Sequence, residues 1–241
     1  MNLDKPTKFY VVNDATQNLT YEYTANGGLV ESYSLNSGNA SPRGAASTAV
    51  GTTVWVVDAN RIVYVYNNSG VLLGSWSAGT MASNATPEGI ATNGTDVWIV
   101  DSKSDKVYKY AGAATRLSGS QMAVSSFKLN SSNTSPKDIV TDGTSLWVVN
   151  DSSTDKVFKY GVAGSLQGSW TISTSGASSP TGITIDPANV SNIWIVDNGS
   201  KLVYQYTASA TLTSGSLAAS ATCALAPATP TLKGSPTHHH H

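Results

Sequence analysis

The sequence repeats itself about every 45 residues, and this internal repeat constrains the fold more than any other feature. An aromatic residue opens each of the runs "YVVND", "WVVDA", "WIVDS", "WVVND" and "WIVDN". Successive anchors are 45, 43, 49 and 47 residues apart. The five anchors are Tyr10, Trp55, Trp98, Trp147 and Trp194. Five units of this spacing identify a repeat protein.

Each unit contains four short segments with strand-like patterns and none with helical periodicity. The first segment, such as "GIAT", is small and apolar, and Asn-Gly or Asp-Gly follows it in two units. The second, such as "VWIV", is a continuous β-branched and aromatic run, which predicts burial on both faces. The third alternates, as in "KVYKY", and the fourth is more polar. We therefore expect burial to decrease toward the fourth strand.

This gradient predicts an all-β fold, a five-bladed β-propeller of four-stranded antiparallel blades, because blades packed face to face bury their inner strands on both sides. The pattern "P-x-G-I-A-T-(D/N)-G-T-x-x-W-(V/I)-V-D-x-x-x-x-K-V-Y-K-Y" resembles NHL-repeat propellers and the related streptogramin-lyase-like and regucalcin-like proteins. The resemblance covers residues 8–217 and implies the propeller fold. It implies no particular activity, because one fold serves many functions.

We expect one propeller domain over residues 1–232, followed by a linker and affinity tag at 233–241. The outer strand of the last blade is expected at 212–217. Because the first unit lacks a first strand, we expect the C-terminal tail to supply it, with Cys223 to Ala226 beside Tyr10 to Asn13, and to close the ring. The alternative is a longer propeller, because "TPT" at 229–231 resembles the "SPT" that starts a repeat. The expected blades are 8–40 plus the tail 220–232, 41–85, 86–134, 135–178 and 179–219.

Composition excludes several partners. The net charge is −1 and the 14 basic residues are scattered, so no basic stripe is present and we expect no nucleic-acid partner. No apolar run reaches the roughly 18–20 residues of a membrane span, and the N-terminus has no signal-peptide core. Charged residues are 12% of the chain, about half the usual share. This polar, weakly charged composition favours a secreted or cell-surface protein, which we expect to be monomeric.

Residues for common catalytic chemistry are missing from the sequence. All four histidines, His238 to His241, lie in the tag, and Cys223 is the only cysteine. A Ser-His-Asp triad and a Cys/His zinc site are therefore excluded. The enzymes among the resembling propellers rely on acidic or histidine residues around the axis. Because Glu22, Glu31 and Glu88 do not recur at equivalent positions, the resemblance does not carry those activities to this chain.

One polar position follows every aromatic run, which places five oxygen-bearing side chains on one rim of the predicted ring. Such a ring suits a hard cation such as calcium. Asp and Asn side chains at strand ends also commonly accept hydrogen bonds from loop N–H groups, so both interpretations stay open. The candidate ligand or metal residues are Asn13, Asp58, Asp101, Asn150 and Asp197.

These patterns favour a non-catalytic binding, adhesion or interaction scaffold with a protein or carbohydrate ligand and no cofactor. The alternative is an NHL-type lyase or hydrolase with a metal at the axis, for which calcium is the candidate. We expect the anchor tryptophans to pack between blades, and Trp76 and Trp170 to pack on the outer strands. Function is expected where the repeat is broken, at 79–86, 116–129 and 186–192.

Overall fold

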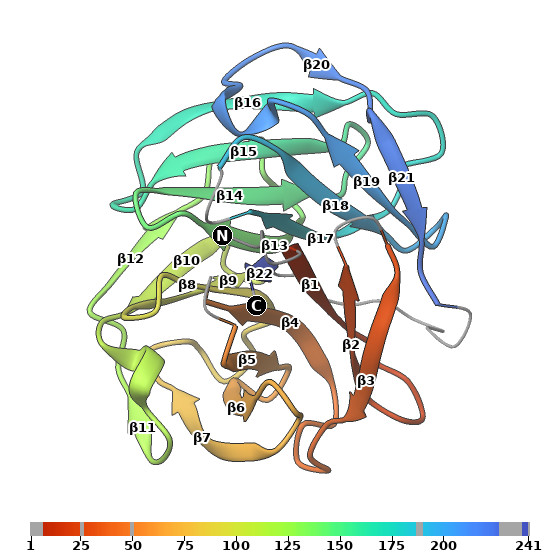
Figure 1. The fold of residues 1–241 in the computed structure, drawn as a ribbon. Coiled ribbons are helices and arrows are strands. Elements are labelled where there is room, and N and C mark those ends of the chain that lie inside the picture. Colours follow the sequence, from red (N-terminus) through yellow and green to blue (C-terminus); the bar gives the residue numbers. More distant parts are fainter. Residues whose placement is uncertain (1–6, 25–26, 49–50, 187–189, 227–237, 241) are drawn as a thin grey trace, which may run out of the picture.

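Five small β-sheets surround a central axis in the computed structural model (Figure 1). The structure describes residues 7–24, 27–48, 51–186, 190–226 and 238–240. The all-β, five-bladed propeller predicted from the repeat is confirmed. No helix within these ranges has the length and apolar character to cross a membrane.

The blades are mainly antiparallel sheets, and their strands follow one another from the axis outward. Blade 1 consists of β22 (His238–His240), β1 (Thr7–Val12), β2 (Leu19–Thr24) and β3 (Leu29–Ser34). Blade 2 consists of β4 (Pro42–Ser47), β5 (Thr53–Asp58), β6 (Ile62–Asn67), β7 (Leu72–Ala78) and β11 (Ser120–Gln121). Blade 3 consists of β8 (Pro87–Thr92), β9 (Val97–Asp101), β10 (Lys106–Tyr110) and β12 (Ser125–Lys128).

The last two blades repeat the pattern of blades 2 and 3. Blade 4 consists of β13 (Pro136–Thr141), β14 (Ser145–Asn150), β15 (Lys156–Gly161), β16 (Leu166–Ile172) and β20 (Ser216–Leu217). Blade 5 consists of β17 (Pro180–Ile185), β18 (Ile193–Asp197), β19 (Leu202–Tyr206) and β21 (Ala221–Ala224). Two short 3-10 helices, η1 (Ala113–Thr115) and η2 (Ser209–Thr211), follow the third strands of blades 3 and 5.

The core lies between the blades. Strands such as β9 and β14 are buried along their whole length, as their continuous apolar sequences predicted. Buried apolar side chains form one cluster at each of the five interfaces, including that between blades 5 and 1. Packing therefore closes the ring. All the tryptophans expected to pack are buried: Trp55, Trp76, Trp98, Trp147, Trp170 and Trp194.

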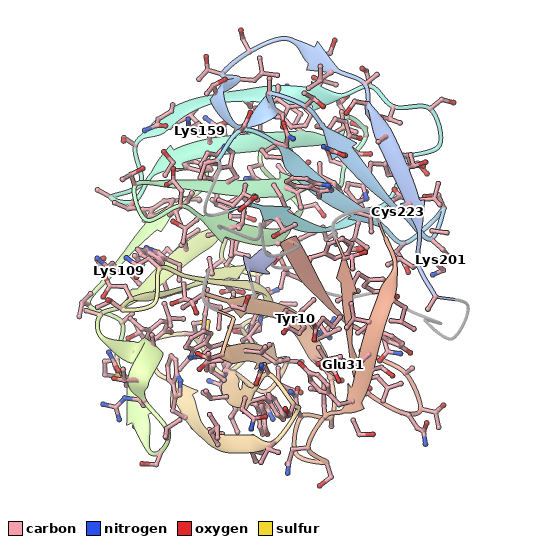
Figure 2. All side chains as sticks on the ribbon, viewed as in Figure 1. Tyr10, Glu31, Lys109, Lys159, Lys201 and Cys223 are labelled. Atoms are coloured by element: carbon pink, nitrogen blue, oxygen red, sulfur yellow. The ribbon has the colours of Figure 1, made fainter. Side chains whose placement is uncertain are left out.

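The closing strand differs from the expected one. C-terminal residues do lie beside β1, but they are His238–His240, which pair with Thr7 to Phe9. The predicted segment around Cys223 instead belongs to β21, the outer strand of blade 5, where Cys223 pairs with Val203 (Figure 2). The prediction that Cys223 to Ala226 supplies the first strand of blade 1 is therefore wrong. The "TPT" at 229–231 lies outside the described residues.

The reason for this difference is a longer connection after the third strand of blades 3 and 5. In each case the chain forms a 3-10 turn and then a short strand that pairs, in parallel, with the outer strand of the preceding blade. A glycine makes room for this strand: a Cβ at Gly74 would collide with the Leu117 carbonyl oxygen, and one at Gly168 with that of Thr213. Residues 212–217 thus approach and pair with blade 4, and their assignment to the outer strand of blade 5 was wrong.

Candidate functional site

The recurring Asp/Asn residues lie where the second strands end, on one rim of the propeller. Their side chains are buried, with at most 2% of their surface exposed. In four blades the residue pairs, across the inner hairpin, with the proline that opens the first strand. We call these five residues the polar ring: Asn13, Asp58, Asp101, Asn150 and Asp197.

Asp101 shows what a member of the polar ring does. Its carboxylate accepts a hydrogen bond from the Thr86 backbone N–H at 2.7 Å, on the segment that enters the first strand of its blade. It also accepts from the Lys103 N–H at 3.0 Å and from Ser104 Oγ at 2.6 Å, in the loop between the second and third strands. One buried carboxylate therefore fixes two rim segments.

Asp58 and Asp197 repeat this arrangement. Asp58 accepts from the Ser41 N–H at 2.8 Å and from the Asn60 N–H at 3.0 Å. Asp197 accepts from the backbone N–H groups of Ser179 and Ser200, both at 2.7 Å. The same two rim segments are fixed in blades 2, 3 and 5.

The asparagines serve the same purpose with neutral oxygens. With its amide oriented to satisfy its neighbours, Asn150 accepts from the backbone N–H groups of Thr134 and Ser135, each at 3.0 Å, and donates to Ser152 Oγ at 2.8 Å. Asn13 accepts from the Leu19 N–H at 2.7 Å. The polar ring thus binds backbone in all five blades.

The structure does not gather these residues into one ion site. Within the described ranges, no three His, Cys, Asp or Glu side chains come together as a metal-binding group. Each carboxylate instead uses its oxygens on N–H groups of its own blade, which is the capping interpretation left open by the sequence. A calcium or ligand role for the polar ring remains a prediction.

A β-bulge lies beside the polar ring in four blades, and a different type of residue occupies it in each blade. Each inner hairpin skips one residue in its register directly after the opening proline. A bulge bends the strand and redirects the extra side chain. These bulged residues are only partly buried, and each opens the innermost strand of its blade at the same rim. We call the four bulged residues the axial set: Arg43, Glu88, Lys137 and Thr181.

The axial set is charged and only partly neutralised. Arg43 Nε is shielded from solvent and has no hydrogen-bond partner among the described residues. Glu88 Oε1 accepts from Ser102 Oγ at 2.8 Å. Lys137 lies near Asp151, and its charge favours the ionised form of that carboxyl group. The set therefore combines two cationic side chains and a carboxylate with the buried hydroxyl group of Thr181, from four different blades.

The ionised form of Asp151 is disfavoured at this rim. Burial raises the pKa of its carboxyl group above the usual value, and the nearby charge of Asp155 raises this pKa further. Lys137 opposes the shift without reversing it. Burial raises the pKa of Asp155 in the same way. Burial thus disfavours the negative charge of both carboxylates at the rim beside Lys137.

Below the axial set the innermost strands approach closely. A Cβ at Gly44 would lie 2.8 Å from the Cα of Gly89, and a Cβ at Gly89 would collide with the carboxylate of Asp138. Asp138 is completely buried, and its Oδ2 accepts from the Ile183 N–H at 2.8 Å. The innermost strands are therefore closely packed and hydrogen-bonded directly beside the axial set.

Sequence reasoning missed the axial set, although its four residues occupy one variable position of the repeat. The residue directly after the proline differs among the four strings "SPRGAAS", "TPEGIAT", "SPKDIVT" and "SPTGITI". The polar ring was found because Asp or Asn recurs in every unit. The residues of the axial set share a bulged backbone position but differ in side chain, so no recurrence identifies them. Among the expected breaks of the repeat, 116–129 holds the crossing strand β11 and the outer strand β12. Residues 187–189 of the 186–192 break lie outside the described residues.

Comparisons with known proteins give the fold and no closer relationship. No protein-family model matches the chain, and no curated protein matches its sequence. Among solved structures, a chain of the nidogen/laminin complex superposes with a TM-score of 0.60 at 14% identity, covering 96% of this chain and 98% of that one. Glutaminyl cyclase from Myxococcus xanthus superposes with a TM-score of 0.54 at 10% identity, covering 75% of this chain and 71% of that one. At such identities, the similarity is one of fold.

Proposed function

We propose that this propeller is a non-catalytic binding module that holds a charged segment of a protein partner over the axial set. The observation that carries this proposal is the repeated bulge, which presents Arg43, Glu88 and Lys137 at equivalent places on neighbouring inner strands. The scaffold is regular and the side chains it presents are not, as a specific binding surface requires.

The charges suggest the class of ligand. Arg43 and Lys137 flank Glu88 around the ring, so a segment with both acidic and basic side chains would find partners for both signs. The charged oxygens nearby, on Asp151 and Asp155, disfavour a purely acidic segment on the blade 4 side. Charge complementarity of this kind contributes to specificity and to the association rate.

The two similar folds include a chain crystallised in a protein complex and an enzyme, so the fold admits both kinds of function. Nothing in the described residues favours the enzyme alternative, a lyase or hydrolase with a metal at the axis, and it is left as a prediction. The protein-binding function has the more specific support because the axial set places unlike side chains at equivalent positions of neighbouring blades.

Fluorescence anisotropy with labelled synthetic peptides tests the proposal. We expect a peptide of alternating Glu and Lys to bind more tightly than all-Glu or all-Lys peptides of equal length. The double variant Arg43→Gln with Lys137→Gln should weaken binding at least about tenfold, since two charge-assisted contacts are lost. Lys103→Gln, which removes an exposed charge from the same rim, should change little. Equal effects of the double variant and the control would overturn the proposal.

A further inference from the structure

An open surface depression of about 540 Å³, which we call the cavity, lies between blades 2 and 3 at the rim opposite the polar ring. Its described lining comes from Thr48, Thr52, Thr53 and Trp55 of blade 2, from the β8–β9 turn and from η1, and it carries no charged side chain. Five of its nine lining residues are threonines, and the others include Asn93 and Trp55. Its volume is in the range of small-molecule sites, which span roughly 300–1,000 Å³.

The polar groups of this cavity have unused hydrogen-bonding capacity. No hydrogen bond involves the side-chain hydroxyl groups of Thr52, Thr53 or Thr95 among the described residues. Asn93 Oδ1 accepts from the N–H groups of Thr95 and Asp96, at 3.0 and 2.8 Å, and this leaves its amide N–H₂ group available as a donor. The described lining thus combines hydrogen-bond donors and acceptors with threonine methyl groups and carries no charge.

The residue that pairs with the anchor tryptophan differs between this interface and the one between blades 4 and 5. At the equivalent interface between blades 4 and 5, Lys159 donates through Nζ to the Ala210 carbonyl at 3.1 Å and lies 5.2 Å over the Trp147 ring (Figure 2). In blade 2 the residue that pairs with the tryptophan is Val65. With the lysine replaced, the indole N–H of Trp55 itself donates to the η1 carbonyl of Ala114, at 3.2 Å.

Turn length is the second difference between the two interfaces. In the inner hairpin of blade 2, five residues separate the strand ends Ser47 and Thr53. In blade 4, three residues separate Thr141 and Ser145. In blade 4 the carboxylate of Asp142 fixes the short turn through hydrogen bonds with the N–H groups of Thr144 and Ser145. The longer turn of blade 2 contributes Thr48 and Thr52 to the cavity.

We propose that this cavity binds a neutral carbohydrate of one or two sugar units. Sugar hydroxyl groups both donate and accept, as the threonine hydroxyls do, and the apolar faces of a sugar suit the threonine methyl groups and the small exposed part of Trp55. A charged ligand would find no partner there. The site is distinct from the axial set, at the other end of the strands, so it stands or falls independently of the protein-binding proposal.

Saturation-transfer NMR with a panel of neutral sugars tests this inference on the full chain. Free sugars and their methyl glycosides are compared, because the glycosides mimic a sugar linked into a chain and so separate a soluble sugar from a terminal glycan. We expect transfer to at least one sugar at millimolar concentration. The isosteric variant Thr53→Val should reduce binding at least about fivefold, since one hydroxyl partner is lost.

Two further variants locate the site. Val65→Lys introduces into blade 2 the lysine that blade 4 has at the equivalent position, Lys159, and should abolish binding. Circular dichroism establishes that this variant is folded. Thr134→Val, at an exposed position on the opposite rim, is the matched control and should leave binding unchanged. No transfer to any sugar overturns the inference. Transfer that survives both Thr53→Val and a folded Val65→Lys places the sugar elsewhere and overturns it as well.

Discussion

The carboxylate of Asp138 accepts a hydrogen bond from the backbone N–H of Ile183 at 2.8 Å, and so joins the innermost strands of blades 4 and 5. Asp138→Ala removes this buried, charge-assisted hydrogen bond, which should cost about 1–3 kcal/mol and lower Tm by roughly 2–12 °C. Asp138→Asn keeps an acceptor oxygen, so its Tm should fall less than that of Asp138→Ala. Thermal melting followed by circular dichroism compares them; equal Tm values for the two variants would show that the bond contributes nothing.

Gly89 is the partner that makes room for Asp138. A Cβ there would collide with the Asp138 carboxylate and lie 2.7 Å from its Cα, so Gly89→Ala must displace an inner strand. We expect a loss of about 1–3 kcal/mol in the free energy of unfolding, measured by urea denaturation. Gly199→Ala is the control, because Gly199 is exposed and the nearest atom to its added Cβ, Asp197 Oδ1, is 3.3 Å away. A Gly89→Ala midpoint matching that of the control contradicts the close approach.

Buried tyrosines should make the fold sensitive to alkali. Burial raises the pKa of Tyr206 from 10.0 to about 12, although its hydroxyl lies 2.9 Å from Thr174 Oγ1 in a hydrogen bond that opposes the shift. Since the folded pKa is the higher one, its contribution to stability is complete below pH 10 and is lost as pH rises toward about 12. Burial likewise raises the pKa values of Tyr10, Tyr66, Tyr110 and Tyr160.

The expected result is a steep fall of Tm above pH 10, with a shallower slope in Tyr206→Phe, which lacks the ionising group. Ultraviolet absorbance of tyrosinate should rise together with the loss of circular dichroism. Ionisation of most tyrosines near pH 10 while the fold persists would show that their hydroxyl groups are accessible to solvent.

Asp151 should destabilise the rim at neutral pH. Its folded pKa is raised by burial and by Asp155, so the charged form is disfavoured on folding and its stabilising contribution is present only at acidic pH. Asp151→Asn should therefore raise Tm at pH 7, and the gain should shrink as pH falls toward the ordinary carboxyl value near 3.8. Melting curves across this range test the sign. A variant less stable than the parent at pH 7 would show that the attraction of Lys137 dominates.

The repeat predicted the blades well because each strand's burial is a local pattern of β-branched and aromatic residues. The outer strand of blade 5 was assigned wrongly because the segments around Leu217 and Cys223 both have the apolar character of an outer strand. The choice between them depends on Gly168, which admits β20 to the edge of blade 4 from a distant part of the chain. The matching strings "ATRLSGS" and "ATLTSGS" did contain this information, since both precede a crossing strand.

The candidate site was less accessible from sequence for a related reason. Asp101 and its equivalents were found because they recur, and the structure shows that recurrence reflects a shared task of fixing rim loops. Arg43, Glu88 and Lys137 were missed because a bulge is a property of the register between two strands. A sequence pattern read along one strand does not contain that register.

The central claim is that the polar ring belongs to the scaffold while the axial set belongs to the binding surface. Thermal melting of Asp101→Ala, with and without millimolar calcium, tests it most directly. Asp101→Ala should lose about 3 kcal/mol, or roughly 6–12 °C in Tm, in either buffer, because three hydrogen bonds to its carboxylate disappear. The Tm of the parent protein should not depend on calcium. A calcium-dependent rise in the parent's Tm that Asp101→Ala abolishes would contradict the claim and assign the polar ring to a metal.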